Sequence, residues 1–187
     1  MPVNKKRIFW VLVFILLFSA GIAAGFFYFS KNSAQLEPVG TTSQADIQIQ
    51  NFSSVRIYYP YEGRLVMEER SIKRLASVIT VAGAIAEEYL KGASKVRSDV
   101  PRGAKLLGVY AGNDGVLYID LSDEFRRNFQ GDALTEHLLL KGLYESIISN
   151  VGGVDDVKVI IEGKEIESIG GHLFVMYPLK NTLAEVK

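Results

Sequence analysis

The clearest alternation of apolar and polar positions lies in the middle of the chain. Residues 105–111 and 116–121 each place apolar side chains at every second position, which indicates half-buried β-strands. Residues 112–115, with the sequence Gly-Asn-Asp-Gly, separate the two runs. A short loop of this composition between two alternating runs is typical of a β-hairpin. We therefore predict a β-hairpin here.

The register of this hairpin follows from which side chains must share its buried face. The apolar sets are Leu107, Val109 and Ala111 on the first strand and Leu117, Ile119 and Leu121 on the second. Directly opposed residues point to the same face, so these sets pair only across a loop with an odd number of residues, and a one-residue shift would bury Asp120. Residues 113–115 provide a three-residue loop. The opposite face would carry Leu106, Tyr110, Val116 and Tyr118, which are candidate contact residues.

Two longer segments repeat apolar residues with the period of an α-helix. The first covers residues 73–91, with Ser71 as its expected cap. The second follows Asp132, its expected cap, and continues to about residue 150. Its apolar stripe is expected at Leu134, Leu138, Leu140 or Lys141, Tyr144, Ile147, Ile148 and Val151. Between the two segments, Ser122 followed by two acids is expected to cap a short helix.

Further strands are predicted on both sides of these helices. Residues 55–60 and 156–162 form confident β-branched or alternating runs, while 64–69 and 165–168 are weaker candidates. The element order is therefore β(β)αββαβ(β). It predicts an α+β domain over 55–178, built as a two-layer sandwich with a mixed or antiparallel sheet and two main helices on one face. Residues 179–187 are a C-terminal tail.

Residues 8–29 form an uninterrupted run of 22 uncharged residues. As a helix, this run would extend about 33 Å, enough to cross a hydrocarbon core about 30 Å thick. The three basic residues of segment 1–7 precede it, and only Lys31 follows closely. The positive-inside bias predicts a cytoplasmic N-terminus, a single-pass signal anchor, and everything after it outside the cytoplasmic membrane, in the periplasmic or extracytoplasmic space.

A cleaved signal peptide is the alternative reading of the same segment, but the apolar run continues through residue 29, beyond any plausible cleavage site. Gly21 and Gly25 have the spacing of a helix-helix contact in membranes. Residues 30–54 are polar and poor in aromatics, which predicts a flexible tether.

Charge and composition narrow the class of function. The chain has 21 basic and 21 acidic residues, and beyond the four cations of the first 31 residues the balance is 17 to 21, a formal −4. That sign is opposite to what nucleic-acid binding requires. The absence of cysteine excludes disulfides, thiolate metal sites and a lipid-modified cysteine.

Few residues in the sequence have the arrangement needed for catalysis, metal binding or phosphate binding. A hydrolase would need Ser122 together with His137 or His172, but Ser122 lacks the G-x-S-x-G context and a capping role accounts for it. The acids around Ser122 lack the spacing of a calcium loop, and Gly103 and Gly108 lack the Gly-Lys-Ser/Thr of a phosphate loop. We predict no catalytic residue, no cofactor, no metal and no nucleotide.

Several motifs resemble the GerM (sporulation and spore germination) domain family over residues 55–178. They are VRIYYP followed by Leu65 and Glu69-Arg70, a helix ending in YLKG, the stretch VPRGAKLLGVYAGNDGVLYIDLSDEF, a helix containing ESI, VKVIIEGKE, and Gly171-His172. The resemblance implies an extracytoplasmic, membrane-tethered module with the ring-building α+β fold of multimeric envelope assemblies, whose members are not characterised as enzymes. The chain departs from the family in having no lipobox cysteine and one domain copy.

The sequence thus predicts a non-catalytic scaffold or interaction module at the bacterial cytoplasmic membrane, which associates with itself or with an envelope protein. Its expected contact surface is Leu106, Tyr110, Val116, Tyr118 and His172. The alternative is a ligand-binding module for peptidoglycan or a lipoprotein, with a groove near Tyr110, Tyr118 and His172. An exported hydrolase is the least supported reading.

Overall fold

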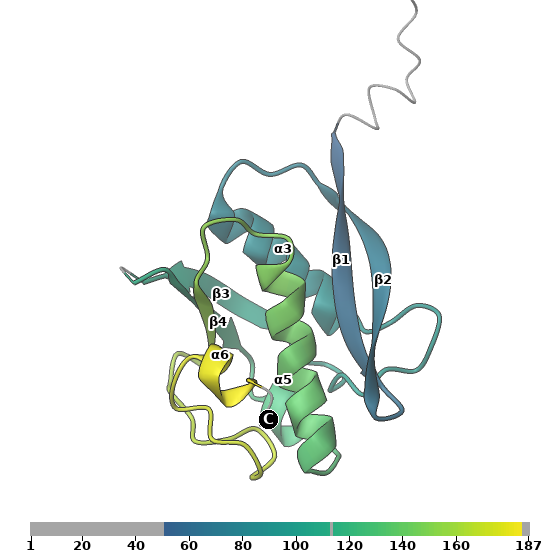
Figure 1. The fold of residues 1–187 in the computed structure, drawn as a ribbon, viewed down its shortest axis with the longest axis vertical. Coiled ribbons are helices and arrows are strands. Elements are labelled where there is room, and N and C mark those ends of the chain that lie inside the picture. Colours follow the sequence, from purple (N-terminus) through teal and green to yellow (C-terminus); the bar gives the residue numbers. More distant parts are fainter. Residues whose placement is uncertain (1–50, 113, 185–187) are drawn as a thin grey trace, which may run out of the picture. The chain divides into compact units, whose positions relative to one another are not determined.

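The elements appear in the predicted order, and the α+β fold class is confirmed (Figure 1). The structure is a computed structural model, and it describes residues 51–112 and 114–184. Its elements are β1 (Phe52–Tyr61), β2 (Arg64–Lys73), α3 (Val78–Leu90), β3 (Leu106–Ala111), β4 (Val116–Leu121), α4 (Glu124–Arg127), α5 (Ala133–Ile148), β5 (Asp156–Ile161) and α6 (Leu179–Thr182). The predicted membrane segment, with Gly21 and Gly25, and the tether up to residue 50 lie outside the described residues.

The strands form two sheets. β1 and β2 make a long antiparallel hairpin in which β2 extends beyond the predicted 64–69. Its two-residue turn, Glu62 and Gly63, has φ values of 47° and 72°, as a type I′ turn requires. The second sheet has the order β3-β4-β5, with β4 antiparallel to β3 and parallel to β5. In place of a strand at 165–168, a single bridge joins Ile161 to Lys164.

The predicted register of the central hairpin is confirmed near its loop, where Ala111 faces Leu117 and Val109 faces Ile119. At the other end a β-bulge interrupts the pairing between Leu106 and Gly108. The extra residue reverses the alternation. Leu106 therefore packs against the core and Leu107 is 50% exposed, so the predicted faces of these two residues are wrong.

Both main helices begin at a capping side chain. Asp132 caps α5 and accepts hydrogen bonds from the Thr135 backbone N–H at 2.9 Å and from its hydroxyl at 2.7 Å. In α3 the cap is Ser77, whose hydroxyl accepts from the Thr80 N–H. The predicted cap, Ser71, lies instead in β2, because the second strand continues further than its sequence pattern suggested.

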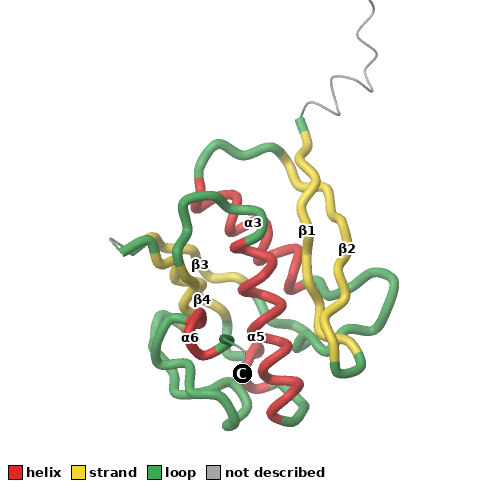
Figure 2. Tube along the Cα trace, in the orientation of Figure 1, coloured by secondary structure: helices red, strands yellow, loops and turns green. Residues whose placement is uncertain are grey.

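Helix α5 runs alongside β1, and α3 contacts both β3 and α5 (Figures 1 and 2). The approach of α5 to β1 is close, since a Cβ at Gly142 would lie 2.6 Å from the Tyr58 carbonyl oxygen. Ser146 of α5, and Asn150 just beyond its C-terminal end, accept the N–H groups of Tyr58 and Arg56. These bonds satisfy one edge of the β1–β2 hairpin, which would otherwise be open to another strand.

The core gathers side chains from every strand and from both main helices. The buried face of α5 carries Glu136, Leu138, Leu139, Leu140, Gly142, Leu143, Ser146 and Ile147. Of the stripe predicted for α5, Leu138, Leu140, Ile147 and Val151 are buried and Tyr144 and Ile148 pack against the core, whereas Leu134 is 52% exposed and its predicted burial is wrong. The inner face of the three-stranded sheet supplies Leu117, Ile119, Leu121, Val157, Val159 and Ile161.

Candidate functional site

The structure brings together only two of the five predicted contact residues. Tyr110 and Tyr118 are cross-strand partners on the face of β3–β4–β5 that points away from the core, which we call the outer face. Tyr110 is 54% exposed, and its ring lies over Gly108, where an added Cβ would come within 2.7 Å of the Tyr110 hydroxyl. Tyr118 is half-buried, with the Lys158 Nζ 5.9 Å from its ring centroid.

The other three predicted contact residues lie elsewhere or are covered. Val116 is buried, and Leu106 is on the core side of the bulge. His172 is exposed on the C-terminal segment, and its backbone N–H donates to Glu136 of α5 at 2.9 Å. The aromatic groove predicted from Tyr110, Tyr118 and His172 therefore has no single place in the fold.

Ser122 is not a helix cap. Asp123 occupies the cap position of α4 and makes no side-chain capping bond. The Ser122 hydroxyl is buried and accepts the backbone N–H of Lys105 at 3.0 Å, while the Ser122 N–H donates to the Lys105 carbonyl at 2.9 Å. Its hydrogen bond to Glu124 lowers the pKa of that carboxyl. Ser122 thus fastens the end of β4 to the start of β3.

Glu68 of β2 is a structural anchor that the sequence analysis did not single out. Its buried carboxylate accepts the N–H groups of Ser94 and Lys95 at 3.0 Å, the Ser94 hydroxyl at 2.8 Å, and Arg70 at 2.9 Å. Desolvation alone would raise the pKa of Glu68, but these hydrogen bonds and the Arg70 charge outweigh it and lower the pKa from 4.5 to about 2. The loop after α3 is therefore tied to the β1–β2 hairpin by an ionised carboxylate.

Arg70 extends the same cluster into the core. Its guanidinium donates to the Gly92 carbonyl and lies 5.7 Å from the centroid of the Tyr59 ring, a cation–π geometry. Tyr59 stacks on Tyr89 of α3 with 5.8 Å between ring centroids. Desolvation raises the pKa of Tyr59 to about 12. The ion-pair partner of Arg70 is Glu68, two residues before it, and the adjacent Glu69 is exposed.

Glu136 is the second anchor that sequence reasoning missed. It is fully buried at the start of α5, and its carboxylate accepts the backbone N–H groups of Ile169, Gly170 and His172, each at 2.9 Å. Gly170 also packs on a ring, since a Cβ there would lie 2.3 Å from Phe129. Glu136 falls three residues before the buried Leu139, so its place on the helical stripe was the signal that it faces inward.

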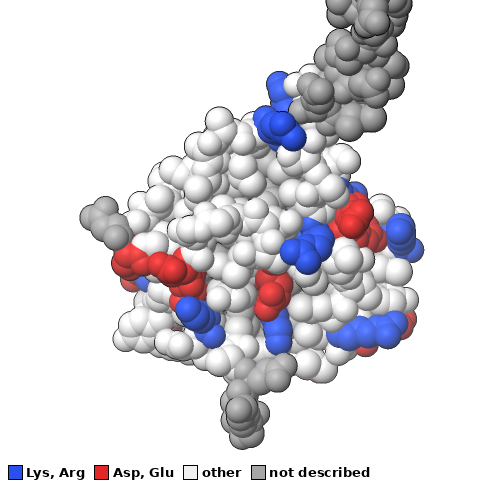
Figure 3. Space-filling model, turned by 45° about the horizontal axis from the view of Figure 1, so that its top comes forward, with Lys and Arg blue, Asp and Glu red and all other residues white. Residues whose placement is uncertain are grey.

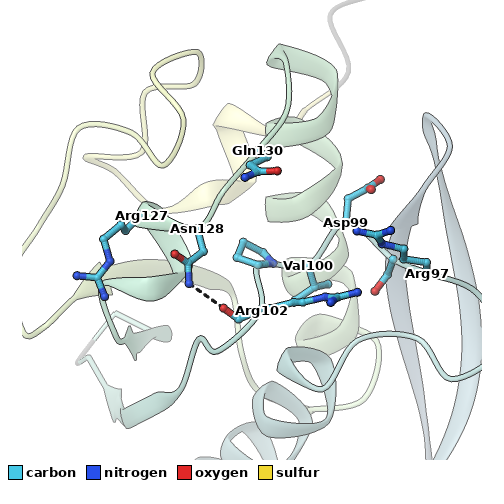
Figure 4. Close-up of a pocket in the computed structure, with 9 residues that line it drawn as sticks. Arg97, Asp99, Val100, Arg102, Arg127, Asn128 and Gln130 are labelled. Atoms are coloured by element: carbon cyan, nitrogen blue, oxygen red, sulfur yellow. Dashed lines mark hydrogen bonds between the residues drawn. The ribbon is translucent and has the colours of Figure 1, made fainter.

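The loop held by Glu68 continues into a polar cavity of about 330 Å³ (Figure 4). The cavity is lined by Arg97, Ser98, Asp99, Val100, Pro101, Arg102, Arg127, Asn128 and Gln130. In Figure 4, Arg97 and Asp99 lie on one side, Arg127 and Asn128 on the other, and the Arg102 side chain extends toward Arg97. A neighbouring cavity of about 240 Å³ shares Arg97 and Arg102 with it.

Elsewhere the charge pattern is mixed. Figure 3 shows one face on which lysine and arginine alternate with aspartate and glutamate around wide uncharged areas.

Within residues 51–112 and 114–184, no group of three or more His, Asp or Glu side chains has the arrangement to hold a metal ion. No helix in those same two ranges combines the length and apolar content needed to cross a bilayer.

Two solved structures share the fold. A crystal structure of a candidate lipoprotein from Clostridium perfringens matches with a TM-score of 0.51 and 18% identity, covering 70% of this chain and 88% of that one. The tandem GerMN domains of the sporulation protein GerM from Bacillus subtilis match with a TM-score of 0.51 and 17% identity, covering 70% of this chain and 47% of that one. The chain thus spans about half the length of the tandem protein.

Sequence comparisons give the family. No curated protein matches the chain. The sequence model of the Germane family, described as sporulation and spore germination, matches residues 56–167, from β1 to beyond β5. Because this match covers more than half of the 187 residues, the chain belongs to the Germane family of sporulation and spore germination.

Proposed function

We propose that this chain is a non-catalytic interaction module, anchored in the bacterial cytoplasmic membrane by residues 8–29, whose folded part lies outside the cytoplasm. It acts by contact with a second copy or with an envelope protein, in an assembly of the sporulation and germination type. Membership of the Germane family supports the class of function. The basic segment before residues 8–29 supports the orientation.

The observation that carries the contact role is the edge strand β3. It is one of the two edge strands of its sheet, and it exposes Leu107 by 50% and Tyr110 by 54%. An edge strand that presents apolar and aromatic side chains can accept an added strand, and exposed tyrosines are frequent anchors of protein interfaces. The outer edge of β1 contrasts with it, since Ser146 and Asn150 already occupy backbone groups there.

A hydrolase finds less support in the same structure. Ser122, the best nucleophile candidate in the sequence, is buried and engaged with Lys105 and Glu124. The carboxylate of Glu136 accepts three backbone N–H groups. These partners give both groups a structural role.

The contact role can be tested by photocrosslinking in cells that produce the full chain. A p-benzoyl-phenylalanine at Tyr110 should form covalent adducts with a second copy or an envelope protein. Tyr177, 68% exposed on the C-terminal segment, is the matched aromatic control. A Tyr110→Lys substitution should abolish the adducts formed from a crosslinker at Leu107, because a charge on an edge strand opposes strand addition. Equal adduct yields at Tyr110 and Tyr177 would contradict a role for β3.

The orientation can be tested independently because the chain has no cysteine. A single cysteine replacing the exposed Glu69 should react with a membrane-impermeant maleimide added to intact cells, and one replacing Asn4 should react only after lysis. The reverse pattern would place the folded part in the cytoplasm.

A further inference from the structure

The cavity beside the loop that follows α3 has features that the contact role does not use. Arg97 and Arg102 line both it and the neighbouring cavity. No carboxylate in the described ranges lies within ion-pair distance of either guanidinium, whereas Arg127 is paired with Glu124 at 2.7 Å. Two guanidiniums at one cavity without ion-pair partners leave strong donors for an anion.

The backbone around these arginines is held in place before any ligand binds. Glu68 fixes the N–H groups of Ser94 and Lys95, and the Asp99 N–H donates to the Pro60 carbonyl at 3.0 Å. On the other side, the Asn128 side chain donates to the Arg102 carbonyl at 2.9 Å. A cavity wall that is already ordered costs little further ordering when a ligand binds.

The size and lining of the cavity restrict the ligand. Buried Val100 and Pro101 contribute apolar surface, while Asn128 and Gln130 add amide groups to other parts of the lining. A volume of about 330 Å³ exceeds the space of a single anionic group and is at the small end of ligand cavities. It suits an anionic group that carries a substituent of the size of glycerol or a sugar.

We propose that this cavity binds a phosphate ester, with Arg102 and Arg97 holding the phosphate oxygens. Guanidinium forks match the geometry of phosphate oxygens and pair with them through two parallel hydrogen bonds. Arg127 contributes less because Glu124 and Asp123 already bind it. Ligand binding at this cavity requires neither the membrane anchor nor a protein partner, so it can be tested independently of the contact role.

Substitution of Asp99 provides a direct test of phosphate binding at this cavity. Its carboxylate lies at the same cavity, where desolvation raises the pKa of Asp99 in spite of the opposing charge of Arg97. An anionic ligand is repelled by this carboxylate. Asp99→Asn should therefore strengthen phosphate binding while Arg102→Gln weakens it, and the two variants change the net charge in opposite directions.

Binding can be measured by calorimetry on the full chain in a non-ionic detergent. The probes are inorganic phosphate, glycerol 3-phosphate as a monoester, and glycerophosphoglycerol as the diester found in a lipid headgroup, with acetate and sulfate as control anions. We expect saturable binding of at least one of the two esters, at least tenfold weaker binding in Arg102→Gln, and about threefold tighter binding in Asp99→Asn. Arg74→Gln, which removes an exposed arginine just after β2, should leave the affinity for every probe unchanged.

Nuclear magnetic resonance of the unmutated chain tests ligand binding without relying on variants that could fail to fold. The Nε–H signals of Arg97 and Arg102 should shift with the ester probe, and the signal of Arg74 should not. Preference for the diester would identify a headgroup-like ligand, and preference for the monoester a soluble one; either supports the proposal. Uniform shifts of all arginines, no saturable binding, equal loss in Arg74→Gln, or equal affinity for acetate and sulfate would overturn it.

Discussion

Two segments with little regular secondary structure, the loop after α3 and the segment after β5 that ends in the short helix α6, are each held by one buried glutamate, but the two glutamates have different surroundings. Glu68 binds two backbone N–H groups, a hydroxyl and the Arg70 guanidinium. Glu136 is fully buried at the start of α5 and binds three backbone N–H groups. The loop bound by Glu68 leads to the polar cavity, whereas the segment bound by Glu136 covers the core.

This difference indicates which of the two glutamates contributes more to the stability of the fold. A buried N–H without an acceptor costs about 1–3 kcal/mol, and the penalty grows where water cannot reach. Removing the Glu68 carboxylate leaves groups on an exposed loop that water can reach. Removing the Glu136 carboxylate leaves the Ile169 N–H buried and detaches a segment whose Ile169, Val175 and Leu179 belong to the core.

The largest effect is therefore expected for Glu136→Ala. We expect it to lower the free energy of unfolding by about 4 kcal/mol, from the lost acceptor for three N–H groups and the vacated volume. Denaturant unfolding followed by circular dichroism measures this. Glu167→Ala, in the exposed part of the same segment, should change stability by less than about 0.5 kcal/mol. A loss below about 1 kcal/mol at Glu136 would show that the segment is held by other contacts.

A smaller effect is expected for Glu68→Gln, about 2–3 kcal/mol, because an amide retains one acceptor oxygen but no charge for Arg70. Hydrogen exchange should accelerate at the Ser94 and Lys95 amides and stay unchanged at Ile169 and Gly170. The exposed neighbour Glu69→Gln is the control. Equal acceleration in both segments would mean that the two anchors are not independent.

Gly170→Ala probes the Glu136 region through packing alone. A methyl group there would lie 2.3 Å from Phe129, so either the ring or the segment must move, at a cost of about 2 kcal/mol. Gly152→Ala, where nothing lies within 4 Å of the added methyl, should be close to neutral. Similar unfolding curves for the two variants would show that Phe129 has room to move.

The smallest effect is a pH dependence specific to Glu68. Since its pKa is lowered from 4.5 to about 2 in the folded chain, its contribution to stability is fully present above about pH 4.5 and is lost as the pH falls toward 2. Between pH 5 and pH 3 the wild type should lose about 1–2 kcal/mol more than Glu68→Gln. Parallel stability curves for the two proteins would contradict an ionised Glu68 in the fold.

Elements governed by local pattern were predicted well. The pairing of Val109 with Ile119 followed from side-chain alternation, and Asp132 stands where a helix cap was expected. The bulge at Leu107 was not predictable, since one extra residue leaves the apolar composition of the strand unchanged. The start of α3 was misplaced because the predicted helix began at residue 73, which is the last residue of β2 and pairs with Phe52 of β1.

The candidate sites likewise divide into features set by local sequence pattern and features set by contacts between distant residues. Tyr110 and Tyr118 were assigned to one face because residues two apart or directly opposed in a hairpin share a face. Nothing local places Glu68 beside Ser94, or His172 beside Glu136, since these contacts join residues 26 and 36 positions apart. The cavity of Arg97 and Arg102 likewise forms only where their loop meets the residues after α4.

By itself, the sequence determined the α+β element order, the hairpin register near its loop and the family, because each depends on residues close together along the chain. Only the tertiary structure decided which charged groups are buried, what they bind and where a cavity opens. The physical reason is that burying a carboxylate is favourable only when distant donors converge on it, and that convergence is a property of the packed chain.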